Sequence, residues 1–331
     1  MNIFLISRSR FRRLSLNNFQ NEKNFGNSKL YNFIGFPLFY LAKIFIFFKL
    51  GKAISLDGNP FLNTKQGINL WMGGTNFKIP KKYYSFKNNY TNMKSIFLNN
   101  KNIFQIYPLN IKQYIKKKNP KIIYVSEINI TKDSNVISLW EKNKIKLLND
   151  FTKIDDVNFW KRFSFFNSKE VCFSYYRKIK NLLRLEIIKK LNSAYKKDFL
   201  LIGSNWSCYG INSKPSVFDR KAVSEIYEGN ICVDLGSIAG SLSLYPRSID
   251  IIESGGILVQ SRQSDFKNIW RNTKIHNDFL FTNFKELFLI INKIFRNKNL
   301  IKELWLNNNT EFQKSNLLMQ KQFNNIFKHN D

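Results

Sequence analysis

One segment near the C-terminal end places an arginine, an aspartate and two glycines close together. Arg247, Asp250 and Ser254 are spaced by three and four residues, so they share one face of a helix. The N-terminus of a helix offers unpaired N–H groups and a partial positive charge, and an adjacent arginine adds to its attraction for phosphate. The spacing therefore predicts a nucleotide-diphosphate site, with Arg247 on the diphosphate and Asp250 on ribose hydroxyls.

The elements around these residues follow from the same segment. Ser243 is a suitable N-cap, Pro246 fits the first helical turn, and a glycine pair ends the helix before the apolar run 257–259, which predicts a buried strand. Ile249 and Ile252 lie on the face that packs inward. Donor-binding candidates beyond Arg247 and Asp250 lie along this helix and in the loop before it: Ser241, Ser243, Tyr245, Ser254, Gly255 and Gly256.

Strands and helices alternate through this part of the chain. Apolar runs predict strands at 199–204 and 279–281, and the segment 230–240 predicts a short strand that runs into a small-residue loop. Helical patterns cover 175–197 and 284–295. Such alternation is typical of a parallel sheet with helices on both faces, where ligands bind beyond the carboxyl ends of the strands. We therefore expect the small-residue loop of the segment 230–240 to lie at the ligand site.

The order GSNW, VFDRKAVSEIYEGNICVDLGS, YPRSIDIIESGG and ILVQSRQSDF resembles the nucleotide-binding half of GT-B glycosyltransferases, closest to the CgeB-like branch of the group 1 enzymes. The resemblance covers residues 175–300. In that branch the segment reads Arg-x-Phe-Glu before a glycine turn, whereas this chain has Arg247-Ser248-Ile249-Asp250 before Gly255 and Gly256. Retaining GT-B enzymes also carry a glutamate eight residues earlier, where this chain has Leu242.

The resemblance implies an α/β, GT-B-like fold with two Rossmann-like domains facing a cleft, the N-terminal one irregular. We expect an acceptor-side domain at 1–170, a nucleotide-sugar-binding domain at 171–310, and a returning helix and tail at 311–331. Predicted strands at 68–71 and 121–125 are assigned to the first domain. Glu127, at the end of the second of these strands, is the candidate general base of a metal-independent sugar transfer, with a solvated surface glutamate as the alternative.

Plainer interpretations of these residues stay open. Arg247 and Asp250 are also spaced for a surface ion pair, which contributes little to stability. Gly255 and Gly256 are explained by backbone geometry at a helix end as well as by ligand approach. A catalytically silent GT-B-fold binding module therefore remains an alternative to the enzyme.

The charge of the chain requires an anionic partner or another explanation. Its 53 Lys and Arg against 23 Asp and Glu give a formal net charge of +30. Nucleic acid, anionic lipid and nucleotide-sugar phosphates are the physical candidates. Richness in Asn, Lys, Ile and Phe also indicates an AT-rich genome, which by itself raises the lysine content. A basic nucleic-acid-binding protein is the main alternative function, although no known nucleic-acid-binding module is recognisable.

Metal and disulfide chemistry are not indicated. The three cysteines, Cys172, Cys208 and Cys232, have neither metal-ligand nor disulfide-framework spacing. His276 and His329 are the only histidines, so a histidine metal site or triad is not expected. We predict no cofactor and no metal, with the nucleotide sugar as donor substrate and a glycan, a protein or a lipid-linked molecule as acceptor.

The segment 31–50 is the nearest approach to a membrane element. It is rich in aromatic residues, but Lys43 and Lys49 interrupt it and Pro37 would kink it. A membrane-interface helix, a buried core helix and a spanning helix remain open for it. The N-terminus is too short in apolar residues for a signal peptide and predicts a first strand. We expect a cytoplasmic protein, peripheral on the inner face of a membrane if the segment is interfacial.

Overall fold

The computed structural model describes residues 3–6, 22–24, 52–55, 67–71, 83–86, 103–104, 112, 115, 117–156, 159–160, 169–217, 219–236, 246–262, 276–297, 300 and 303. Side chains are described only from residue 112 onward. The segment 31–50 and the expected C-terminal helix and tail at 311–331 lie outside these residues. Among the described helices, none is long and apolar enough to cross a membrane.

The first part of the chain forms a six-stranded parallel sheet. Its strands are β1 (Ile3–Ile6), β2 (Glu22–Asn24), β3 (Lys52–Ser55), β4 (Gly67–Trp71), β5 (Tyr83–Phe86) and β6 (Ile103–Phe104), in the order β2-β1-β3-β4-β5-β6. Each neighbouring pair is parallel. The strands expected at the N-terminus and at 68–71 are confirmed.

The second part forms a five-stranded parallel sheet in the order β11-β10-β9-β7-β8. Its strands are β7 (Ile122–Val125), β8 (Phe199–Ile202), β9 (Ile231–Asp234), β10 (Ile257–Ser261) and β11 (Leu280–Phe281). After β8 forms beside β7, the chain crosses to the other side of β7 for β9, so the order reverses between β7 and β9. This is the doubly wound topology in which ligands bind at the reversal, beyond the carboxyl ends of the strands. The predicted α/β class with a parallel sheet is confirmed.

The assignment of strand 121–125 to the N-terminal domain is wrong. Strand β7 pairs along Ile122–Val125 with β8 and through Ile122 and Ile123 with β9, so it lies inside the five-stranded sheet. The change from one sheet to the other therefore falls between β6 and β7, well before the expected boundary at residue 170. An apolar strand that is buried on both faces has no local feature that marks which sheet it joins.

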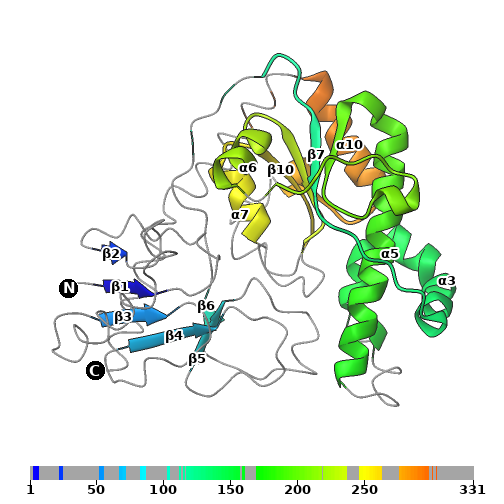
Figure 1. Cartoon of the computed structure of the whole chain (residues 1–331). Coiled ribbons are helices and arrows are strands. Elements are labelled where there is room, and N and C mark those ends of the chain that lie inside the picture. The colour runs from blue at the N-terminus through cyan, green and yellow to red at the C-terminus, as the bar shows by residue number, and fades with distance from the viewer. Residues whose placement is uncertain are drawn as a thin grey trace.

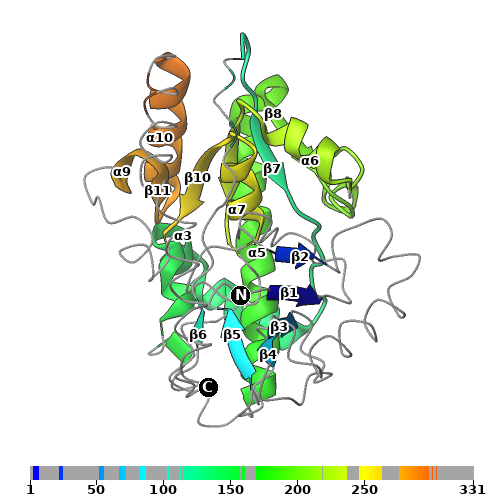
Figure 2. The ribbon, with the colours of Figure 1, turned by 90° about the vertical axis from the view of Figure 1, so that its left-hand side faces the viewer.

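Helices cover both faces of this sheet (Figure 1). Helices α5 (Lys169–Tyr195) and α10 (Phe284–Arg296) pack on one face, and α6 (Arg220–Tyr227) and α7 (Pro246–Glu253) lie on the other. Helix α3 (Ser134–Asn149) packs against α5 rather than on the sheet, as Figure 2 also shows. The short helices η2 (Phe151–Asp155), η3 (Lys196–Asp198), η4 (Ser207–Tyr209) and α9 (His276–Phe279) complete the described elements.

Local sequence signals explain where these helices begin and end. Asp133, Asp219 and Asn283 cap α3, α6 and α10 by accepting hydrogen bonds from backbone N–H groups of the first turn. Helix α7 starts at Pro246, which was expected within its first turn, and the predicted N-cap Ser243 lies outside the described residues. At its other end Gly255 has φ +74°, and the N–H groups of Gly255 and Gly256 bond to the carbonyls of Ile252 and Ile251. This Schellman arrangement stops the helix and starts β10.

Candidate functional site

The carboxylate of Asp234 organises the edge of the sheet at the end of β9. Asp234 is fully buried and accepts a 3.0 Å hydrogen bond from the Gly236 N–H. Its other oxygen accepts a hydrogen bond from the hydroxyl of Ser248, and the Arg247 Nη1 lies 3.4 Å from Oδ1. Arg247 and Ser248 belong to the first turn of α7. One carboxylate therefore holds both ends of the loop that connects β9 to α7.

A second strand supports the same contact. Gln260 is the β10 residue in register with Asp234, and its Nε2 donates a 3.1 Å hydrogen bond to the Ser248 hydroxyl. Both side chains are completely buried. The Gln260 Oε1 has no hydrogen-bond partner among the described residues. The chain from Gln260 through Ser248 to Asp234 fixes α7 against the ends of two strands.

One arginine reaches the same edge from the opposite layer. Arg184 of α5 donates a hydrogen bond from Nη2 to the carbonyl of Gly236. Gly236 has φ +71°, a left-handed conformation that favours glycine. Its N–H is held by Asp234 and its carbonyl by Arg184, so the first residues beyond β9 are fixed from both faces of the sheet.

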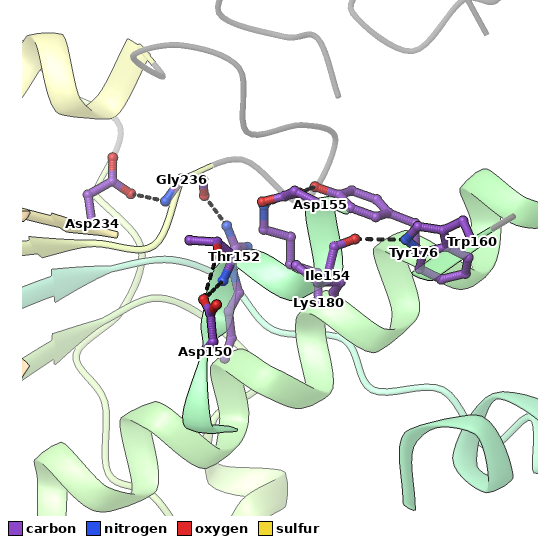
Figure 3. Close-up of polar contacts among 10 residues, drawn as sticks. Asp150, Thr152, Ile154, Asp155, Trp160, Tyr176, Lys180, Asp234 and Gly236 are labelled. Carbon is purple, nitrogen blue, oxygen red and sulfur yellow. Dashed lines mark hydrogen bonds and ion pairs between the residues drawn. The ribbon is translucent and has the colours of Figure 1, made fainter. Parts of the chain in front are cut away.

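Lys180 lies one turn before Arg184 and belongs to a buried polar cluster. The Lys180 Nζ donates a 3.0 Å hydrogen bond to the Tyr176 hydroxyl, which donates a 2.6 Å bond to Asp155 of η2. The Lys180 Nζ and the Asp155 Oδ1 are 3.9 Å apart. Figure 3 shows this cluster and the contact between Asp234 and Gly236. The cluster brings a buried ammonium group near the edge where β9 ends.

Burial is the main influence on the pKa of Lys180 and lowers it to about 8. The carboxylate of Asp155 opposes this shift, Arg184 lowers the pKa further, and Asp234 raises it. Because Arg184 and Asp234 both affect the pKa of Lys180, the three charged groups lie near one another. Near neutral pH this neighbourhood retains two buried cations from α5.

The end of β7 lies at the same edge, since β7 and β9 are parallel neighbours. The Trp206 indole N–H donates a 2.6 Å hydrogen bond to the Ser126 carbonyl, and Tyr124 and Trp206 make an edge-to-face contact. Glu127 follows directly and is exposed; its Oε1 is 3.3 Å from the Ser216 hydroxyl. Glu127 was expected on an acceptor-side domain across a cleft. The strand pairing instead places it at the carboxyl edge of the same sheet as Arg247.

The predicted donor-binding residues lie at two ends of α7. Arg247 is at the carboxyl edge of β9, with 16% of its side chain exposed. Asp250 is 9% exposed and Ser254 6%, so the helix face expected to be polar is buried. Ser254, Gly255 and Gly256 lie at the opposite end of the helix, where a Cβ on Gly256 would come within 2.8 Å of the Tyr227 carbonyl.

Ile249 and Ile252 are buried, as expected. Three candidates, Ser241, Ser243 and Tyr245, lie outside the described residues.

Several residues of this edge were not singled out from the sequence. The sequence carries a recognisable signal for some of these residues. Asp234 is an acidic residue at the end of an otherwise apolar strand, which is where doubly wound folds place ligand contacts. Tyr176, Lys180 and Arg184 recur every four residues within a predicted helix, so they form one stripe. Ser248, Gln260 and Asp155 have no comparable signal, because their partners are distant in sequence.

Metal ligands do not gather at this edge: the described residues contain no group of three or more His, Cys, Asp or Glu side chains that could hold a metal ion. Neither the models of known protein families nor the curated protein sequences contain a match to this chain.

Proposed function

We propose that this protein is a glycosyltransferase that binds a nucleotide-diphosphate sugar at the carboxyl edge of the five-stranded sheet. The observation that carries the proposal is the position of Arg247. It lies on the first turn of α7, at the end of β9 beside the reversal of strand order, and the buried Asp234 lies 3.4 Å from its Nη1. Doubly wound sheets bind nucleotides in this position.

The electrostatics of this edge favour a diphosphate. The N-terminus of α7 provides backbone N–H groups with a partial positive charge. Asp234 orients a guanidinium group that carries donors on both terminal nitrogens in a planar fork, which matches the geometry of phosphate oxygens. In this proposal Arg247 and the helix supply the positive charge that offsets the diphosphate, and no metal is required.

The remaining roles are assigned by chemistry. Asp250, three residues after Arg247 on α7, is the proposed contact for ribose hydroxyls. Glu127 is the proposed general base, because it is an exposed carboxylate at the same edge of the sheet. The proposed acceptor is a glycan, a protein or a lipid-linked molecule, and the aromatic segment 31–50 would bring the protein to an anionic membrane surface.

A thermal-shift screen against UDP-, GDP-, ADP- and CMP-sugars tests the donor class. A ligand at about 100 times its dissociation constant stabilises a protein by roughly 2.7 kcal/mol. Calorimetry with the best ligand then compares Arg247→Ala with the wild type, and we expect binding to weaken by about 1.5–3 kcal/mol. Arg177→Ala, which removes an exposed arginine of α5, should bind as the wild type does. If no nucleotide sugar stabilises the protein, the proposal is wrong.

The net charge of +30 favours a second candidate, a nucleic-acid-binding protein. Contacts to a phosphate backbone release counterions, so such binding should fall steeply between about 50 and 200 mM salt. Binding of a nucleotide sugar should change much less over this range. Tight, salt-sensitive binding of RNA or DNA without any nucleotide-sugar binding would favour the second candidate.

A further inference from the structure

Arg184 is a buried cation, and the part of the chain that the structure describes offers one of its donors no acceptor. Its residue is 4% exposed, and its Nη2 donates to the Gly236 carbonyl. The Arg184 Nε has no hydrogen-bond partner among the described residues. An unsatisfied donor on a buried charge is costly, and native proteins rarely keep one without a reason. The Gly236 carbonyl bears only a partial negative charge, so it does not neutralise the guanidinium. The guanidinium therefore still attracts an anion.

The position of this donor is specific. Gly236 is the second residue beyond β9, and β9 borders the reversal of strand order between β7 and β9. Lys180 lies one helical turn from Arg184 on the same stripe of α5, and its charge interacts with those of Arg184 and Asp234. Asp155 lies 3.9 Å from Lys180, and Asp234 lies 3.4 Å from Arg247. Asp155 and Asp234 thus each lie near a cation other than Arg184.

We propose that Arg184, with Lys180 beside it, binds a phosphate oxyanion of the ligand at the reversal between β7 and β9. This inference rests on the proposed function, because the anion site lies at the same edge of the sheet. It adds a ligand contact from α5 to the contact that α7 makes. The anion would accept a hydrogen bond from the Arg184 Nε. Arg184 would then hold the ligand and the Gly236 carbonyl at once, which couples ligand binding to the start of the loop between β9 and α7.

The chemistry of the two cations suits this role. Arginine presents parallel N–H donors that match two oxygens of one phosphate, whereas lysine contributes a compact charge. Both groups are buried, so water screens their attraction for an anion only weakly. Tyr176 accepts a hydrogen bond from Lys180 and donates one to Asp155, which fixes the direction of the ammonium group.

Inorganic pyrophosphate is the probe, and the Nε–H resonance of Arg184 in nitrogen-15 NMR is the readout. The resonance is assigned through the Arg184 side-chain carbons, so the wild-type measurement needs no variant. We expect this resonance to shift in a saturable way as pyrophosphate is added, while the Nε–H of Arg177, an exposed arginine on the same helix, stays in place. No binding of pyrophosphate, or binding without a shift at Arg184, would overturn the proposal.

A variant separates ligand contact from a structural role. Arg184→Lys keeps the positive charge but lacks the Nε donor and the planar fork, so we expect pyrophosphate to bind at least tenfold more weakly. Arg177→Lys is the matched control and should bind unchanged. Unaltered affinity in a folded Arg184→Lys protein would refute the contact.

The two proposals can fail separately. If pyrophosphate shifts the Arg184 resonance but no nucleotide sugar stabilises the protein, the proposed function is wrong and the anion site stands. If nucleotide sugars bind while neither they nor pyrophosphate move the Arg184 resonance, the anion site alone is refuted.

Discussion

The carboxylate of Asp234 and the guanidinium of Arg247 lie 3.4 Å apart, with Asp234 fully buried and Arg247 largely so. Asp234 ends β9 and Arg247 begins α7, so this pair joins a strand to the helix that follows it. Arg247 was expected to act on a ligand or to pair with Asp250 on the surface. Its contact with Asp234 also ties this candidate phosphate-binding residue to the interior of the protein.

Asp234→Asn should destabilise the protein by about 2–4 kcal/mol, because it leaves Arg247 without its buried charge partner and weakens the bonds from Ser248 and Gly236. Urea unfolding measures this change. Asp198→Asn is the matched control, since Asp198 makes an exposed ion pair with Lys121 at 3.0 Å. That change should cost less than about 1 kcal/mol. Equal effects of the two substitutions would contradict a structural role for Asp234.

Gly203→Ala should be among the most damaging single substitutions in the five-stranded sheet. Gly203 has φ +146°, and a Cβ there would lie 1.9 Å from the carbonyl oxygen of Ser126, which cannot move without disturbing the end of β7. We expect a loss of about 3 kcal/mol or more in the free energy of unfolding. Gly210→Ala provides the comparison, because Gly210 has φ +71° but open space around it. Its cost should be only about 1–2 kcal/mol.

Stability should depend on pH through Lys180. Its pKa is about 8 in the folded protein and 10.5 in the unfolded chain, so between these values the unfolded chain binds more protons. The contribution of Lys180 to stability should therefore rise with pH across this window, by up to about 3 kcal/mol, and should be constant below pH 8.

Other groups titrate in the same window, so the measurement requires a reference variant. Burial raises the pKa of Tyr195 to about 12 and also raises the pKa of Cys232, and both effects reduce stability as the pH rises. Lys180→Met removes only the Lys180 contribution. The difference in unfolding free energy between wild type and Lys180→Met should change from pH 8 to pH 10 in favour of the wild type. A difference that stays constant would mean that the pKa of Lys180 is not lowered.

The cysteines should differ in their reaction with a thiol reagent. Cys208 is exposed, whereas Cys172 and Cys232 are buried, and burial raises the pKa of both buried thiols. The native protein should therefore react rapidly at Cys208 alone, and the unfolded protein at all three. Cys208→Ser should abolish the rapid reaction. A second rapid thiol in that variant would contradict the packing around α5 or β9.

The sequence determined the local elements of the five-stranded sheet well. Apolar runs located β8, β9, β10 and β11, and helical spacing located most of α5 and α10. The glycine pair located the end of α7 correctly, and Pro246 lies in its first turn as predicted. These features depend on contacts a few residues apart, which propensity and capping rules describe directly.

Tertiary structure alone decided which strands are neighbours and which charges meet. The hydrogen bond of 2.6 Å from Trp206 to the Ser126 carbonyl joins residues 80 positions apart, and β7 lies between β8 and β9 rather than in the first sheet. Arg184 reaches the Gly236 carbonyl, 52 positions away, only because α5 packs on the sheet that contains β9. Pairing between distant segments depends on how whole layers of helices and strands pack together. The local sequence of a short segment does not identify its distant partner.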